Sequence, residues 1–225
     1  GALIAFAVYF SIGRYSGASN TGAGTQPQPQ AQQPQPAQAI DIAKVKIAGE
    51  PFIGNPNASV TIAYWYDYQC PFCKRSEEDA LPQLISDYIK TGKAKLVYKD
   101  FQFLGPDSQT AGLISRAVWD TAPAKFYQWH KVVYDKQDGE NSGWGSKDDI
   151  LAMTKTIAGI DIGKVEQLVA TKSADYQKAI DSDKAEGSEF GVGGTPSFII
   201  GKQLIVGAQP YPTIKAAVDN VLNGK

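Results

Sequence analysis

Hydrophobic and polar positions divide the chain into three parts. Residues 1–13 open with the apolar run GALIAFAVYFSI, which is shorter than the roughly 20 residues needed to cross a bilayer. We interpret this part as the remnant of a transmembrane anchor or signal segment, with a short buried helix as the alternative. Residues 14–39 contain the run QPQPQAQQPQPAQ, which offers no large apolar side chain for burial and predicts a disordered, semi-extended linker. A docking site for a proline-binding module is the alternative there. Residues 40–225 carry the pattern of a folded domain.

The first half of this domain has the pattern of strand, helix and strand. Residues 60–66 are β-branched and aromatic and follow a Gly-Asn-Pro-Asn turn, which predicts a central strand. The next helix is predicted to kink at Pro82 and to end near Gly92; its apolar face consists of Leu81, Leu84, Ile85, Tyr88 and Ile89. A second strand over 94–98 follows closely, and a strand-helix-strand unit of this length implies parallel pairing through a right-handed crossover.

The second half of the domain is a helical block followed by a hairpin and a helix. Residues 107–189 are almost entirely helical in pattern, with Ser146 and Asp149 spaced as a capping box and two late helices over about 161–170 and 174–188. A block of this length is too long for a loop and predicts a helical insertion. Strands over 197–200 and 203–206 flank a two-residue Gly-Lys junction, as in a tight antiparallel hairpin, and a last helix begins near 210–212. This order predicts an α/β thioredoxin fold with an inserted helical subdomain.

Composition and charge narrow the possible chemistry. The chain has 225 residues, of which 43% are hydrophobic, as in a globular protein with a core. Its net charge is -1, which gives no electrostatic reason to expect a nucleic-acid partner. Two cysteines and one histidine are too few for a tetrahedral structural zinc site, which needs four ligands, so we expect no metal.

Both cysteines lie in one tetrapeptide, Cys70-Pro71-Phe72-Cys73, directly after the predicted central strand and at the start of the next helix. Open α/β sheets place their sites at this end of the strands, and the N-terminus of a helix favours a thiolate over a thiol. We therefore predict that Cys70 is the attacking thiolate and that Cys73, one turn further in, is the resolving thiol. Pro71 suits the first helical turn because its missing N–H would have no partner there. A static disulfide and a metal clamp are the alternatives.

A second motif is the segment Gly191-Val192-Gly193-Gly194-Thr195-Pro196-Ser197, immediately before a predicted strand. Alone, it is typical of a plain glycine-rich turn. If the Thr195-Pro196 bond is cis, the segment would form a tight loop that faces the two cysteines. The backbone of Gly194 and Thr195 would then be free to pair with an extended substrate segment.

The two motifs together resemble the DsbA-like, BdbD-type thioredoxin family. The likeness covers about residues 47–222, including Lys99-Asp100-Phe101 and the helical insertion. It implies disulfide exchange outside the cytoplasm, in the periplasm or at the cell surface, with Cys70 attacking, Cys73 resolving and Thr195-Pro196 as the cis-proline pair. It also implies reduced or unfolded client proteins and a DsbB- or VKOR-like redox partner in the membrane, with the Cys70-Cys73 disulfide in place of any cofactor.

Two positions depart from the family pattern. Phe72 stands where DsbA has a charged histidine, so we predict a Cys70 pKa below the ordinary value of about 8.5 but above the value of about 3.5 for DsbA. Tyr64 replaces the buried acid that relatives place six residues before the first cysteine. Proton transfer to Cys73 would then use water or Asp67, although Asp67 is also interpreted as a helix-entry residue.

Other residues near the motif receive weaker interpretations. Tyr68 and Phe72 are predicted to form an apolar rim that receives clients. Lys74 and Arg75 are interpreted as solvated surface residues, and His130 as a helix residue of the insertion rather than a catalyst.

The sequence therefore predicts a membrane-anchored, monomeric dithiol oxidase that introduces disulfides into extracytoplasmic proteins. A disulfide reductase or isomerase using the same site is one alternative, and a non-enzymatic thioredoxin-like binding module is another. Isomerases of the superfamily carry a dimerisation domain before the catalytic one, whereas only the predicted linker stands there in this sequence.

Overall fold

The computed structural model describes residues 40–224. The predicted anchor remnant (1–13) and linker (14–39) lie outside these described residues. Within them, every helix falls short of the combination of length and hydropathy that a bilayer-crossing segment requires.

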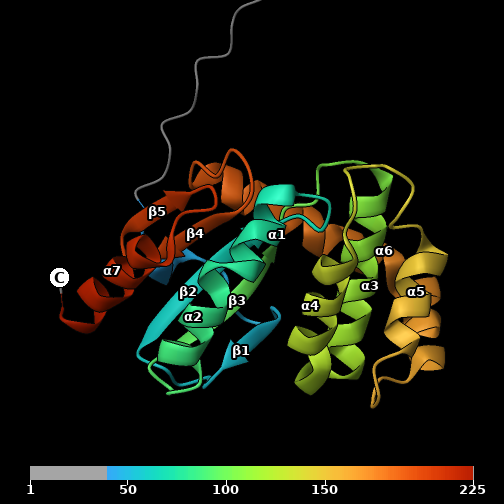
Figure 1. The fold of residues 1–225 in the computed structure, drawn as a ribbon, viewed down its shortest axis with the longest axis horizontal. Coiled ribbons are helices and arrows are strands. Elements are labelled where there is room, and N and C mark those ends of the chain that lie inside the picture. Colours follow the sequence, from blue (N-terminus) through green and yellow to red (C-terminus); the bar gives the residue numbers. More distant parts are fainter. Residues whose placement is uncertain (1–39, 225) are drawn as a thin grey trace, which may run out of the picture. The chain divides into compact units, whose positions relative to one another are not determined.

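A five-stranded mixed sheet forms the centre of the domain, with strand order β1-β3-β2-β4-β5 (Figure 1). The strands are β1 (Phe52–Gly54), β2 (Val60–Tyr66), β3 (Ala94–Asp100), β4 (Ser197–Ile200) and β5 (Gln203–Val206). The pairing of β2 with β3 is parallel, as predicted, and the remaining pairs are antiparallel. The predicted hairpin over residues 197–206 is confirmed, with Ile200 opposite Gln203.

Strand β2 lies in the middle of the sheet because both of its faces are apolar. Ile62, Tyr64 and Tyr66 belong to the larger core, whereas Ala63 and Trp65 belong to a smaller core on the opposite face. This alternation follows from the two-residue period of a strand. Strand β1 was not predicted, since a three-residue edge strand leaves almost no periodic pattern.

The polypeptide between β2 and β3 is helical but interrupted. It comprises α1 (Pro71–Glu78), α2 (Ala80–Leu84) and the π-helical turn η2 (Ile85–Ile89). The break at Asp79 confirms the predicted kink, because the ring of Pro82 clashes with the carbonyl four residues earlier, that of Glu78. The segment ends at Gly92, whose φ of 75° is left-handed, as expected for a terminating glycine.

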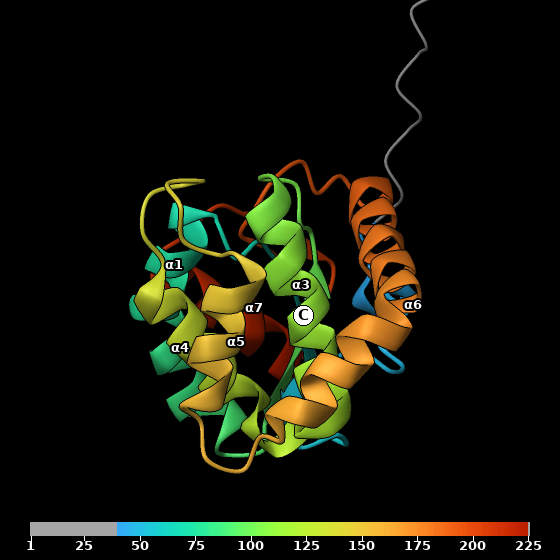
Figure 2. The same cartoon turned by 90° about the vertical axis from the view of Figure 1, so that its right-hand side faces the viewer.

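Between β3 and β4 the chain forms the predicted helical insertion, which lies beside the sheet in Figure 1 and faces the viewer in Figure 2. Its helices are α3 (Pro106–Thr121), the short η3 (Pro123–Lys125), α4 (Phe126–Lys136), α5 (Lys147–Lys155) and α6 (Ile162–Glu189). Ser146 caps α5 through the N–H of Asp149, as predicted. The prediction of two separate late helices is wrong, because α6 is continuous over 28 residues.

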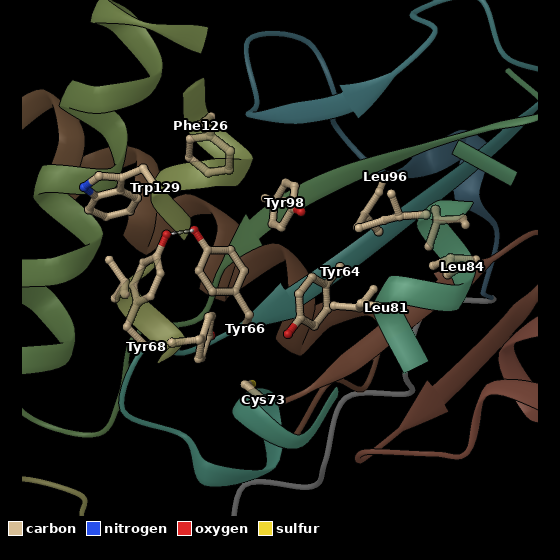
Figure 3. Close-up of a cluster of buried hydrophobic side chains, with 14 of the residues drawn as sticks. Tyr64, Tyr66, Tyr68, Cys73, Leu81, Leu84, Leu96, Tyr98, Phe126 and Trp129 are labelled. Carbon is tan, nitrogen blue, oxygen red and sulfur yellow. Dashed lines mark hydrogen bonds between the residues drawn. The ribbon is translucent and has the colours of Figure 1, made fainter. Parts of the chain in front are cut away.

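Two apolar clusters hold these layers together. The larger cluster joins one face of the sheet to α1, α2, the insertion and the last helix, α7 (Tyr211–Leu222) (Figure 3). The smaller cluster lies on the other face, where residues from the start of the domain, including η1 (Ile42–Lys44), meet Trp65 and Phe190. A buried network of ion pairs joins the sheet to α3 and α6 beside it: Arg116 of α3 contacts Asp100 of β3 at 2.6 Å and Asp183 of α6 at 2.5 Å.

Candidate active site

The two cysteines lie at the start of α1, directly after β2. Cys70 is the N-cap residue and Pro71 occupies the first turn of the helix, as predicted. Backbone N–H groups at this end have no intrahelical partner and favour negative charge. Both cysteines are free thiols in this structure.

The Cys70 thiol is acidic. A hydrogen bond from the Cys73 thiol lowers the pKa of Cys70 to about 6, with smaller contributions from the Thr195 side chain and the N–H groups of Cys73 and Phe72, while partial burial opposes the change. This value lies below the ordinary cysteine pKa of about 8.5 and above the value of about 3.5 for DsbA, as the sequence predicts. Because only the thiolate attacks disulfides, Cys70 is suited to nucleophilic attack at neutral pH.

The Cys73 thiol has the opposite character. Its side chain is fully buried, and burial raises the pKa of Cys73 well above its ordinary value, with the hydrogen bond to Cys70 and the Cys70 charge adding to the effect. The two sulfurs therefore form an asymmetric couple, in which Cys70 ionises readily and Cys73 retains its proton.

The Thr195-Pro196 peptide bond is cis, and its loop faces the cysteines. The Cys70 thiol donates a hydrogen bond to the Thr195 carbonyl at 3.3 Å. Pairing of β2 with β4 brings the loop there, because Trp65 lies opposite Ser197 in the register. Pro196 is buried, whereas Gly194 and Thr195 are half-buried at the edge of the site.

The comparisons with known proteins agree with this geometry. A family model described as Thioredoxin matches residues 46–220. Disulfide bond formation protein D of Bacillus subtilis (strain 168) is 27% identical over 179 residues, which cover 80% of each chain. The thiol-disulfide exchange protein α-DsbA2 of Wolbachia pipientis has a crystal structure that superposes with a TM-score of 0.68 and 30% identity, over 77% of this chain and 88% of that one.

The chain is a DsbA-like member of the thioredoxin family. The crystal structure of oxidised BdbD from Bacillus subtilis shares the fold, with a TM-score of 0.75 at 24% identity over 84% of this chain and 99% of that chain. The predicted family and the predicted class of enzyme, a protein-disulfide oxidoreductase, are thereby confirmed.

Of the two residues predicted to form an apolar rim, Phe72 is exposed, whereas the prediction for Tyr68 is wrong. The Phe72 side chain is 55% exposed, between the two cysteines and beneath the guanidinium of Arg75. Tyr68 is fully buried, because its hydroxyl hydrogen-bonds Ser115 and His130 inside the helical insertion. Tyr68 thus supports the cysteine loop from within and offers no surface to a client.

The charged residues near the site also take defined positions. Lys74 and Arg75 reach backbone carbonyls of Gln137 and Ala208, at 2.9 and 3.0 Å, rather than being only solvated. The carboxylate of Asp67 accepts hydrogen bonds from the N–H groups of Gln69, Phe103 and Leu104. This arrangement fits the interpretation of Asp67 as a residue that fixes the entry to the helix.

Sequence reasoning missed two buried polar residues of this region, Gln137 and Glu77. Gln137 follows α4 and donates its amide protons to the carbonyls of Tyr68 and Cys70; no sequence signal marks it. Glu77 pairs with His130 at 2.9 Å. Two signals could have indicated this pair: Glu77 lies four residues after Cys73 and therefore on the same helix face, and His130 shares the apolar face of α4 with Phe126 and Tyr134. His130 is a helix residue of the insertion, as predicted.

Proposed function

We propose that this DsbA-like enzyme is a dithiol oxidase that introduces disulfides into extracytoplasmic proteins. The Cys70-Cys73 disulfide is the oxidant and needs no separate cofactor or metal. A reduced or unfolded client supplies two thiols, and a DsbB- or VKOR-like membrane partner restores the disulfide. The enzyme acts as a monomer, held at the membrane by the anchor predicted in residues 1–13 and spaced from it by the linker predicted in residues 14–39.

The acidity of Cys70 is the observation that supports an oxidase rather than a reductase. A thiol with a pKa of about 6 is mostly ionised at neutral pH, so the site stabilises the reduced form of the enzyme. A stabilised reduced form makes the corresponding disulfide a stronger oxidant. The same thiolate is a good leaving group when a client thiol displaces it.

The proposed reaction proceeds through a mixed disulfide. A client thiolate attacks the Cys70 Sγ of the enzyme disulfide, forming a client-Cys70 bond while the Cys70-Cys73 bond breaks and its electron pair passes to Cys73. The second client thiolate then attacks the bridged client sulfur, and Cys70 leaves as a thiolate. Two electrons pass from the client dithiol to the enzyme, and the client gains one disulfide.

Clients bind where the site is open. Phe72 supplies exposed apolar area beside Cys70, which suits unfolded segments that still expose apolar side chains. Gly194 and Thr195 border the sulfurs, and an added Cβ at Gly194 would meet no atom within 4 Å, so there is space for a backbone to approach. An extended client strand can hydrogen-bond along this edge.

Equilibration with glutathione measures the reduction potential and so tests whether the enzyme oxidises or reduces its clients. We expect a Cys70-Cys73 reduction potential closer to that of DsbA, about -120 mV, than to that of thioredoxin, about -270 mV. A value near that of thioredoxin would assign the enzyme as a reductase. A domain that bound reduced, unfolded substrate without oxidising it, and that bound it equally well as the Cys70→Ser variant, would instead be a binding module.

A further inference from the structure

Glu77 is a buried carboxylate that has no role in the exchange steps proposed above. It lies on α1 one turn after Cys73, on the same face of the helix. Its side chain is only 2% exposed, and its Oε1 atom lies 2.9 Å from the His130 Nε2 atom. The Oε2 atom has no hydrogen-bond partner among the residues that the structure describes. A buried carboxylate oxygen without a partner is costly, which points to a role other than stability.

His130 holds this carboxylate in place. The imidazole is fully buried, and its Nδ1 atom is 3.0 Å from the Tyr68 hydroxyl, which in turn donates to Ser115 at 2.9 Å. Both ring nitrogens are therefore engaged. The buried pair can hold one exchangeable proton, as imidazolium with carboxylate or as imidazole with carboxylic acid.

Tyr64 connects this pair to the active site. Its ring stacks on Phe198, and its hydroxyl points toward Cys73 (Figure 3). Burial raises the pKa of Tyr64 well above its ordinary value, and negative charge on Cys73 and on Glu77 raises it further. The hydroxyl makes no hydrogen bond of full geometry to any described residue. It is thus a neutral group that can accept one proton while donating another.

Besides burial, the Glu77 charge also raises the pKa of four further tyrosines, which are therefore neutral at neutral pH: Tyr98 of β3, Tyr68 of the loop after β2, and Tyr127 and Tyr134 of α4. The pKa of each is raised chiefly by burial. Among the described residues, His130 is the side chain that hydrogen-bonds the Glu77 carboxylate, at 2.9 Å.

Disulfide exchange requires a proton to move at Cys73 in both directions. When a client displaces Cys73, its sulfur leaves as a buried thiolate and must gain a proton. When the reduced enzyme is reoxidised, the Cys73 thiol must lose that proton before its sulfur attacks Cys70, releasing the sulfur of the other molecule as a thiolate. Water has little access to a fully buried thiol.

We propose that the Glu77-His130 pair exchanges this proton with Cys73 through the Tyr64 hydroxyl. In this role Glu77 replaces the buried acid that Tyr64 displaces from the family pattern. Glu77 acts through another residue and is therefore a positioning residue for proton transfer. The inference rests on the proposed exchange reaction at Cys70 and Cys73.

The test follows the reaction of the fully reduced protein with a chromogenic aromatic disulfide in a stopped-flow instrument. Cys70 attacks first and releases one coloured thiol, and Cys73 then resolves the mixed disulfide and releases the second. The first phase reports the proposed nucleophile, and the second reports proton removal from Cys73. Failure of the proposed function would remove the first phase, whereas failure of this inference would leave both phases normal in the variant.

We expect Glu77→Gln to slow the second phase about tenfold or more at neutral pH, as for loss of a general base, without changing the first phase. The Glu77→Asp variant, which retains a carboxylate, should recover part of the rate. The matched control is Glu78→Gln, because Glu78 is the exposed neighbour on the same helix. An unchanged second phase in Glu77→Gln, or equal slowing in Glu78→Gln, would overturn the proposal.

The wild-type protein supplies a second test that does not depend on the folding of a variant. With a buried base, the rate of the second phase should rise with pH and then level off far below the pH at which Cys73 titrates unaided. A rate that continues to rise in proportion to hydroxide into the alkaline range would overturn the proposal, because solvent would then take the proton directly.

Discussion

The thiol of Cys70 lies 3.3 Å from the carbonyl oxygen of Thr195, although the two residues are 125 positions apart in the chain. Cys70 follows β2 and Thr195 precedes β4, so the antiparallel pairing of these strands sets the distance between them. The whole helical insertion lies between the two residues in the sequence. The active site therefore depends on the register of the sheet centre and on the residues that hold the loop over 67–70.

Gln137 is one of those residues, and its loss should loosen the loop. Its amide donates to the carbonyls of Tyr68 and Cys70 at 2.6 and 3.2 Å. Replacement by alanine leaves two buried acceptors without this donor, at a cost of about 1–3 kcal/mol. We expect Gln137→Ala to lower stability in urea by this amount and to slow the first exchange step. The exposed Gln128 on α4 is the control, and equal losses in Gln128→Ala would contradict this account.

Phe72 limits the acidity of Cys70, because it places an uncharged side chain between the cysteines. A histidine there would add positive charge near the thiolate when protonated and so lower the Cys70 pKa further. We expect Phe72→His to lower this pKa and to make the enzyme disulfide more oxidising, since a more stable thiolate stabilises the reduced form. Thiolate absorbance and equilibration with glutathione measure the two effects. The control is Phe103→His, which changes another exposed phenylalanine outside the cysteine motif. It should change neither the Cys70 pKa nor the reduction potential.

Gly187 allows α6 to pack closely against Trp65. A Cβ at this position would lie 2.7 Å from the Trp65 Nε1 atom, and Trp65 is fully buried, with its indole N–H bonded to the Asp183 carbonyl at 3.0 Å. Overpacking costs about 1–3 kcal/mol, which exceeds the gain of at most about 1 kcal/mol from removing a helical glycine. We expect Gly187→Ala to lower the free energy of unfolding.

The control for this substitution lies in the same helix. A Cβ at Gly163 would make only an ordinary contact, at 3.5 Å from an Asp161 carboxylate oxygen. We expect Gly163→Ala to leave the stability unchanged or to raise it. If Gly187→Ala were equally harmless, α6 would not be held as closely to β2 as the structure shows.

The sequence predicted those features that depend on short-range patterns. The central strand, the parallel β2-β3 pairing, the break caused by Pro82 and the cis Thr195-Pro196 bond are all confirmed. The first three follow from local signals, such as a run of β-branched and aromatic residues or a proline within a helical pattern. The cis bond is expected because the glycine-rich segment occurs together with the cysteine motif, as in the family that the two motifs resemble.

The features that the sequence missed depend on tertiary packing. Tyr68 was expected at the surface because an aromatic residue beside a reactive cysteine suits a binding rim, but the helical insertion covers it. Glu77 and Gln137 are polar residues whose burial depends on partners about 50 to 70 positions away. The single helix α6 replaced two predicted helices, since its middle residues, 171–173, are polar and carry no apolar signal.

Titration of the Cys70 thiolate is the most direct test of the central claim, that the start of α1 and the Cys73 thiol hold Cys70 as a thiolate. The ultraviolet absorbance of the fully reduced protein, corrected with the Cys70→Ser variant, should show a midpoint at about pH 6. The rate of Cys70 alkylation should rise with pH through the same midpoint and remain constant above it. The midpoint should increase in Cys73→Ala, because the hydrogen bond from Cys73 is the largest cause of the acidity. A wild-type midpoint of about 8 or higher, close to that of a free cysteine, would contradict the account.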